Sequence, residues 1–408
     1  MRLLSIGAAL AVLFAAPAVA AQATDLDVYD RPARLATNAA EPAKQPLAVE
    51  LHGYVQPQFG ARYYPDALVA DRWQYGGLSS RAGLIISGSP IRDWSYVVHL
   101  SVDARALQIL TSADLIDTDG NGQAEGLIVT HTSVPATLFE EVTIAYSPFP
   151  FLKVKMGAMR VPFTVALRSA NTAQMFANRP GANEIFQSGS DQGLLALGNW
   201  LDGRAQASLG MFTGTSLGLL PPSTDSRGLL YSARVDGNPL GPLPYSGFDF
   251  DRAAFRFGVG VGALYRDATL FTRTGYELAD IRDVRTSASI RAAFRGGSLQ
   301  AEAFRRLGTD NVSSRPNRAT GAYAQGSFFF PVAQTVGLAP VGRVGVSTED
   351  ELTLPRRTVY IEGGVAFFPK IDIPRPDTVR VLAQYLGENR ILENEKGHAG
   401  ILQVQVLF

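Results

Sequence analysis

Apolar and polar side chains alternate along the chain from Leu47 to its end, and this period of two constrains the fold more than any other feature. From Phe255 to Tyr265, for example, apolar side chains alternate with Arg256 and three glycines. Because successive side chains of a β-strand point to opposite faces, the pattern predicts strands with one apolar and one polar face. The sequence therefore indicates an all-β fold.

Breaks separate the alternating runs, and the runs predict about sixteen strands, an even number as in single-chain membrane barrels. The predicted strands span residues 48–63, 72–88, 93–106, 136–147, 151–160, 192–199, 204–213, 227–236, 253–265, 282–294, 298–306, 319–330, 338–347, 357–368, 377–386 and 398–408.

The alternation alone does not distinguish a membrane barrel from a soluble sandwich, because both have one apolar face. Three further features favour the membrane. The polar face carries many small residues together with Arg and Glu. Short breaks alternate with long ones, and aromatic clusters lie beside the short breaks, as in an interfacial girdle. The short breaks are at 147–150 and 295–297, the long ones at about 107–135, 161–191 and 267–281, and the aromatic clusters at 328–330 and 367–368. We therefore predict a transmembrane antiparallel β-barrel, with outer-membrane lipids outside and an aqueous lumen inside.

The first residues have the features of a secretory signal peptide. Arg2 precedes an apolar run at 6–19, and the run ends in Ala18-Val19-Ala20, which predicts cleavage after Ala20. A transmembrane anchor fits poorly, because the run is short and contains Pro17. Residues 21–47 show no period and are predicted to be a flexible periplasmic leader, so the barrel domain spans 48–408.

The last predicted strand places Leu402, Val404, Val406 and Phe408 on one face and two glutamines on the other. A terminal aromatic residue on an amphipathic strand resembles the signal that the bacterial outer-membrane assembly machinery reads. That machinery is an expected partner, and the Gram-negative outer membrane is the expected location.

Charge and cysteine content exclude some functions. The chain has 37 basic and 37 acidic residues and no cysteine. The balance gives no reason to expect a nucleic-acid partner, and disulfides and thiolate chemistry are impossible. Nearly all the basic residues are arginines, which suit fixed contacts with carboxylate or phosphate.

The break at 161–191 is predicted to be the functional element. Pro162 near its start removes a ladder donor and should end the preceding strand, and loops of this length are usually functional. In a barrel it can fold inward as the third outer loop and narrow the lumen. It carries Arg168 and Arg179, with Arg160 at its root. Strand parity places further arginines on the lumen face: Arg256, Arg266, Arg285, Arg291 and Arg295.

Fixed positive charge in a narrow pore raises the local concentration of anions, so these arginines predict a path for small anionic solutes. An alternative is that they pair with lumen acids such as Glu141, Glu302 and Asp103. Such pairs would brace the wall and leave little selectivity.

Few other residues are candidates for catalysis or solute binding. Glu140 and Glu141 are adjacent on a predicted strand and should point to opposite faces, with Glu141 in the lumen. The four histidines have no visible Ser or carboxylate partner, so no catalytic site is predicted. His52 and His99 have the parity of the lumen face.

A long outer break contains Asp117, Asp119 and Asn121 in an Asp-x-Asp-Gly-Asn-Gly run that spaces oxygen ligands as calcium requires. The bidentate Glu of a calcium-binding EF-hand loop is missing, since Ile128 stands there. A plain Asp/Asn/Gly turn without metal is the alternative.

Two stretches resemble the phosphate-selective porin O and P family of Gram-negative outer membranes. One is Gly157-x-x-Arg160-Val161-Pro162-Phe163 followed by Ser190-Asp191-Gln192-Gly193, and the other is the hairpin at 291–304. The resemblance covers roughly 48–408. It implies a sixteen-stranded homotrimeric channel whose third outer loop folds into the lumen, with arginines that guide anions. Members that select phosphate carry lysine clusters at the outer mouth, which this chain lacks, so general anion passage stays open beside phosphate selectivity.

Two other classes also remain open. A barrel enzyme would need a convergent set of His, Ser and Asp side chains. An adhesin or structural barrel would place its specificity in the outer loops and keep its lumen plugged.

Overall fold

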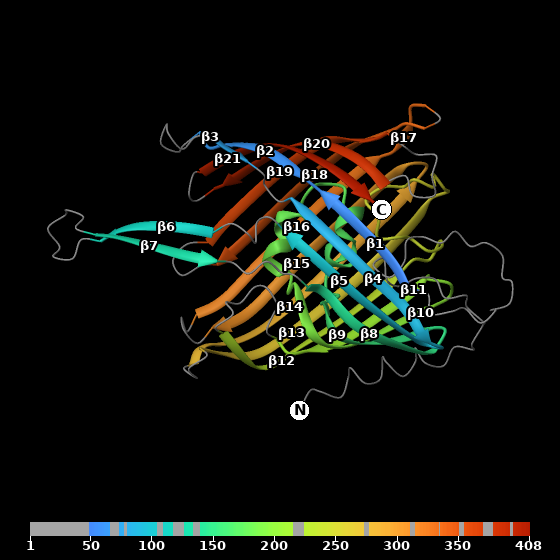
Figure 1. Ribbon diagram of the computed structural model, residues 1–408, viewed down its shortest axis with the longest axis horizontal. Helices are drawn as coiled ribbons and strands as arrows, with labels where there is room; N and C mark the ends of the chain where they lie inside the picture. The colour runs from blue at the N-terminus through green and yellow to red at the C-terminus, as the bar shows by residue number, and fades with distance from the viewer. Residues whose placement is uncertain are drawn as a thin grey trace.

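The computed structural model describes residues 49–65, 73–76, 80–103, 109–116, 126–133, 139–214, 224–272, 277–310, 315–333, 335–350, 355–369, 378–391 and 395–408. The predicted signal peptide and leader lie outside these residues. The described chain forms a closed 16-stranded antiparallel β-barrel, which confirms the predicted fold class (Figure 1). Among the described residues, no helix is long and apolar enough to cross a membrane.

The wall strands pair in chain order. The elements up to the inward loop described below are β1 (Val49–Gln56), β2 (Gln58–Tyr63), β3 (Trp73–Gly76), β4 (Arg81–Ile91), β5 (Trp94–Asp103), β6 (Ile109–Ile116), β7 (Gly126–Ser133), β8 (Phe139–Phe149) and β9 (Leu152–Arg160). Those after it are β10 (Ser190–Trp200), β11 (Ala205–Phe212), β12 (Thr224–Gly237), β13 (Arg256–Thr272), β14 (Glu277–Phe294), β15 (Gly297–Asp310), β16 (Arg315–Phe328), β17 (Phe330–Pro331), β18 (Gly337–Asp350), β19 (Pro355–Phe368), β20 (Val379–Arg390) and β21 (Glu395–Leu407).

Pairing of β21 with β1 and β2 closes the ring. β1 and β2 form one wall strand that is interrupted at Pro57. Because proline has no N–H to donate, the ladder continues there only through Val404, which donates its N–H to the Pro57 carbonyl at 3.1 Å. Phe408 exchanges both backbone hydrogen bonds with Gly53 and so completes the seam.

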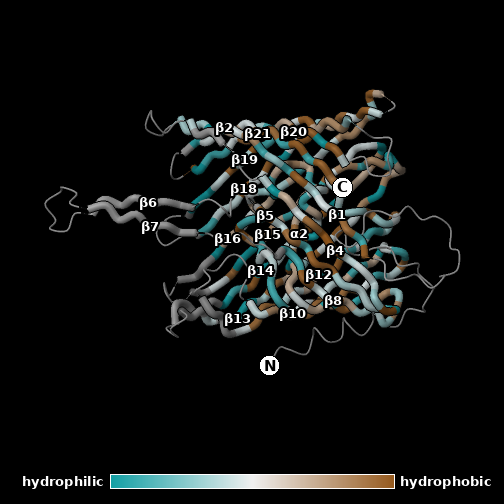
Figure 2. Tube along the Cα trace, in the orientation of Figure 1, coloured by the Kyte–Doolittle hydropathy of each residue, from teal (hydrophilic) through white to brown (hydrophobic). Residues whose placement is uncertain are grey.

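The outward side chains are apolar, as the alternation predicts. On β13, Val259 and Val261 are 49% and 61% exposed, whereas Leu264 on the inner face is 1% exposed. Hydrophilic residues predominate toward the end of the wall that bears β6 and β7, and apolar ones toward the opposite end (Figure 2). Apolar side chains on the outer face are those that a transmembrane barrel presents to lipid.

The two ends of the barrel differ. We call the end with the tight connections 92–93, 150–151 and 295–296 the turn end, and the opposite end the loop end. Outward aromatic residues ring the turn end, among them the packed pair Trp94 and Tyr146 and the half-exposed Phe149, Phe294 and Phe328. The predicted girdle is therefore present there. Phe329 and Phe368 do not belong to it, because they face inward and are 4% and 0% exposed.

Three predicted breaks differ from the structure. The break at 267–281 is wrong, because β13 and β14 continue as strands up to Thr272 and from Glu277. The break at 107–135 contains a separate hairpin of β6 and β7, which projects from the loop end (Figure 1). At the turn end, residues 238–255 form a long connection without regular structure, where the predicted asymmetry allows only short turns.

Candidate pore constriction

Residues 161–189, which we call the inward loop, connect β9 to β10 and lie inside the ring. They contain α2 (Val165–Arg168), η4 (Asn171–Ala173) and α3 (Gly181–Phe186). Pro162 ends the β9 strand, and the Thr164 hydroxyl caps α2 by accepting the N–H of Leu167. The predicted inward-folded third outer loop is therefore present, and hydrogen bonds to nearly every part of the wall fix its position.

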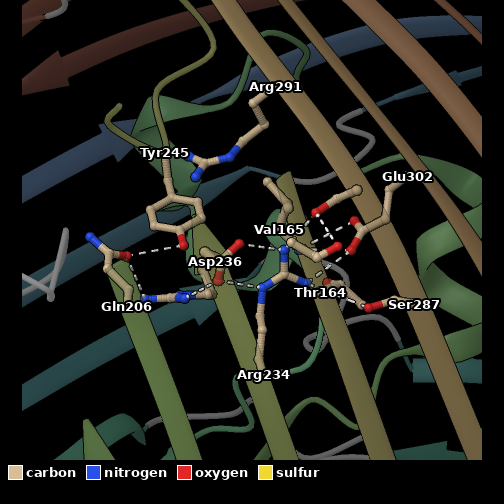
Figure 3. A network of polar contacts seen from close by, with 12 residues as sticks. Thr164, Val165, Gln206, Arg234, Asp236, Tyr245, Ser287, Arg291 and Glu302 are labelled. Atoms are coloured by element: carbon tan, nitrogen blue, oxygen red, sulfur yellow. Dashed lines mark hydrogen bonds and ion pairs between the residues drawn. The ribbon is translucent and has the colours of Figure 1, made fainter. Parts of the chain in front are cut away.

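Arg234 on β12 is the centre of the first anchor (Figure 3). Its guanidinium donates to both carboxylate oxygens of Asp236, at 2.9 and 2.8 Å, and to the Phe163 carbonyl of the inward loop at 3.0 Å. Glu302 on β15 lies 3.4 Å from the same guanidinium and accepts the N–H of Val165 at the start of α2. The side chains of Arg234 and Glu302 are both fully buried, so the ion pair is shielded from solvent. Its contribution to stability therefore depends strongly on its geometry.

The opposite wall supplies the second anchor, near residues 174–178 of the inward loop. Arg380 on β20 donates to the Gln174 carbonyl at 2.6 Å, and Gln384 accepts the N–H of Ala177. Arg343 on β18 donates to the Asn178 carbonyl at 2.9 Å and to Glu362 on β19. Since the first anchor is on β12 and β15 and the second on β18 and β20, the loop crosses the lumen.

Apolar packing fixes α3. Phe186 is 0% exposed and stacks on Phe304 of β15 with ring centroids 5.0 Å apart. Leu230 and Leu264, on β12 and β13, belong to the same buried cluster and also face the lumen. Arg285 on β14 closes the cluster by donating to the Phe186 carbonyl at 2.9 Å. This part of the lumen is packed rather than lined by water, which alternation does not reveal.

Arginines gather on a different side, where the inward loop faces β4, β8 and β9. Arg81 and Arg179 donate to the carbonyls of Ala177 and Ala166, and Arg160 donates to that of Ser169. Arg160 also forms an ion pair with Glu140. Burial lowers the pKa of Arg179 from its ordinary value; the charge of Glu140 opposes this shift and that of Arg81 adds to it. Within the described residues, Nη2 of Arg179 is buried and has no hydrogen-bond partner.

A β-bulge turns Glu140 into this cluster. The β5–β8 register shifts between His99 and Leu100, so that His99 faces Glu141 and Leu100 faces Phe139. Both carboxylates consequently point inward: Glu140 lies 3.4 Å from His99, and Glu141 accepts from Lys155 at 2.6 Å. The expectation that they point apart is wrong, because the extra residue of a bulge breaks the period of two.

The structure separates the predicted arginines into groups. Arg160 and Arg179 lie together, whereas Arg168 donates to Asp236 on β12 at 2.7 Å. Arg256 and Arg285 form ion pairs with Asp249 and Asp283. The remaining two lumen arginines donate to backbone carbonyls: Arg266 to Gly214, and Arg291 to Leu243 and Pro244.

Arg295 is not on the lumen face. β14 ends at Phe294, and Arg295 turns the chain with φ 48° and is exposed, so the strand parity used to place it does not apply. Sequence reasoning also missed Arg81, Arg234, Arg343 and Arg380. The sequence could have indicated Arg234, because it alternates with apolar residues and lies on the same face of its strand as the polar Ser232 and Asp236.

The calcium prediction at Asp117, Asp119 and Asn121 lies outside the described residues and stays a prediction. Within the described residues, no three His, Asp or Glu side chains are grouped to hold a metal ion.

A closed barrel with an apolar outer face, an aromatic girdle and a loop folded across its lumen has the architecture of outer-membrane β-barrels. The fold is similar to that of the outer-membrane-expressed OmpT of Vibrio cholerae, at 10% identity and a TM-score of 0.51 over 90% of this chain and 100% of that one. It is also similar to the anion-selective porin from Comamonas acidovorans, at 13% identity and a TM-score of 0.50 over 89% and 100% of the two chains. No protein-family model and no curated protein matches the chain. The similarities establish the fold, and the resemblance to the phosphate-selective porin O and P family stays a prediction.

Proposed function

We propose that the protein is an outer-membrane porin whose narrowed lumen lets small hydrophilic solutes diffuse passively and prefers anions, phosphate among them. The observation that carries the proposal is the convergence of Arg81, Arg160 and Arg179 on the inward loop, inside a closed membrane barrel. The barrel supplies a route across the bilayer, and the arginines supply the charge at its narrow part.

The environment of Arg179 explains why this cluster, rather than the other lumen arginines, is proposed to attract solutes. Arg168, Arg256 and Arg285 donate to carboxylates, so their charge is largely neutralised. Arg179 donates instead to a backbone carbonyl, and the residue is only partly buried. A guanidinium stays charged and is weakly hydrated, so a passing anion can replace water there without being trapped. The anion-selective porin of similar fold is a precedent for such a preference in this architecture.

Replacing Arg160 and Arg179 together by Ala should shift the reversal potential of single channels in a salt gradient toward cation preference. The expected shift is large because the change also leaves Glu140 without the ion pair it forms with Arg160. The matched control is Arg92→Ala, which removes a charge from a side chain that is 94% exposed at the turn end and therefore screened by salt. A wild-type channel that prefers cations, or an unchanged reversal potential in the double variant, would refute the anion proposal.

The packed cluster around Phe186 supports a second candidate, a structural or adhesive barrel with a plugged lumen. Conductance of the purified protein in planar bilayers separates the two. Stepwise single-channel currents support the porin, and their complete absence from a correctly folded barrel supports the plugged barrel.

The homotrimer implied by the family resemblance, and recognition of β21 with Phe408 by the barrel assembly machinery, are further parts of the proposal. Native gel mobility before and after heating tests the first, and assembly of a Phe408→Ala variant tests the second.

A further inference from the structure

Residues 238–255, which we call the turn-end segment, are longer than the topology requires. β12 and β13 are hydrogen-bonded neighbours, with Gly237 opposite Val259, so a two-residue turn could join them. The connection between β14 and β15 is such a turn, since it consists only of Arg295 and Gly296. Connections longer than about 12–15 residues without regular structure are usually functional.

The turn-end segment extends from the turn end into the lumen and contacts the inward loop. The Ser169 hydroxyl donates to the Tyr245 carbonyl at 2.7 Å, and the N–H of Gly247 donates to the Ala173 carbonyl at 2.9 Å. The guanidiniums of Arg168 and Arg291 lie 4.4 and 4.0 Å from the centroid of the Tyr245 ring. Figure 3 shows Arg291 beside this ring. Cation–π contacts of desolvated arginine are favourable, and they join α2, the segment and β14.

The same segment also covers the inner faces of several neighbouring wall strands. Ser298 on β15 and Ser327 on β16 both donate to the Gly247 carbonyl, at 2.6 and 2.8 Å. Phe248 and Phe250 then pack against the inward Phe368 and Phe329, with ring centroids 5.3 and 5.0 Å apart. This explains why those two rings face the lumen rather than the girdle.

We propose that the turn-end segment is a second constriction, between the inward loop and the turn end of the lumen. We call Tyr245 its latch, because the position of this side chain would open or close the constriction. This inference rests on the proposed porin function. A solute that has passed the inward loop leaves the barrel only when Tyr245 moves away from Arg168 and Arg291. The segment suits this role because individual hydrogen bonds and ring contacts, rather than a strand ladder, hold it in place. Arg291, which donates to backbone carbonyls, also places positive charge at the latch, so the solutes that it admits are small anions.

The test is single-channel recording of the full chain and three variants. Tyr245→Ala removes the latch, and replacement of residues 239–254 by Asn-Gly removes the segment. Leu240→Ala is the matched control, because this side chain belongs to the segment but is 53% exposed. Heat-modifiable gel mobility confirms that each variant forms a barrel. We expect the open probability to rise at least ten-fold in Tyr245→Ala, the conductance to increase in the Asn-Gly variant, and Leu240→Ala to match the wild type.

Currents that are the same in all four proteins would overturn the second constriction while leaving the porin proposal intact. If no variant conducts, including the one without the segment, the porin proposal fails and the inference fails with it.

A labelling experiment gives an independent readout that does not disturb the latch. Because the chain has no cysteine, Ser246→Cys creates a single thiol beside Tyr245. A charged thiol reagent added from the turn end should change the single-channel current if the segment lines the path. An unchanged current after complete labelling would place the segment outside the path and overturn the proposal.

Discussion

Replacing Arg234 by methionine should lower the free energy of unfolding of the barrel by about 3–5 kcal/mol, the usual cost of removing one partner from a buried ion pair. Methionine fills much of the space but leaves Glu302 buried without a cation, and Asp236 with only Arg168. The Phe163 carbonyl loses its guanidinium donor and retains the Ser287 hydroxyl at 3.1 Å. The temperature at which the folded barrel loses its fast gel mobility measures the effect.

The control for this substitution is Arg282→Met on β14. Arg282 lies 3.5 Å from Asp267, but the two side chains are 62% and 43% exposed. An exposed pair contributes under about 1 kcal/mol, so this variant should unfold close to the wild-type temperature. Equal stability of the two variants would show that the Arg234 network does not stabilise the barrel.

Phe186→Ala should release the inward loop from the lumen. The ring is completely buried against Phe304, and truncation of a buried phenylalanine costs about 3–5 kcal/mol because a cavity remains. The loss falls on α3, which would keep the hydrogen bonds of its backbone to Tyr360 and Arg285. Trypsin provides the measurement, since the loop carries a cleavage site after Arg168. We expect this site to resist trypsin in the wild type and to be cut rapidly in the variant.

Phe328→Ala is the comparison for Phe186→Ala. Phe328 is 50% exposed on the outer face, so its removal creates no cavity inside the barrel. The inward loop should remain resistant to trypsin in this variant. Rapid cleavage in the wild type, or persistent resistance in Phe186→Ala, would contradict the packed position of α3.

The period of two predicted the strands, because burial against lipid imposes it on every strand of the wall. Prediction of the closed barrel also needed the small residues of the polar face, the order of short and long breaks and the aromatic clusters. The period did not predict where strands end at the loop end. Asp267 and Arg282 lie in parts of β13 and β14 that extend beyond the membrane. Both faces of a strand can be polar there, so the alternation is lost and the sequence predicts a loop. Tertiary pairing between β13 and β14 overrides the composition.

The site was predicted less completely than the wall. The inward position of Phe163–Arg168 followed from Pro162 and the length of the break, but the partners of each arginine depend on strands far away in the sequence. Arg168 illustrates this, because only the structure brings it to Asp236 on β12. Glu140 shows a second limit, since a single bulge reverses the face of a side chain. The turn-end segment shows a third: a run rich in proline and glycine indicates a break but not the direction in which it folds.

The wall holds the inward loop chiefly by its backbone. Arg234, Arg285, Arg343 and Arg380 all donate to carbonyl oxygens of the loop, at Phe163, Phe186, Asn178 and Gln174. A carbonyl is present whatever side chain the residue carries. The path of the loop is therefore encoded largely in the strands around it, and polar side chains of the loop other than Thr164, Arg168 and Ser169 can diverge without moving it. Such a barrel is a suitable starting point for engineering: grafting new polar residues onto positions 171, 184 and 187 should change which solutes pass while the route through the lumen stays the same.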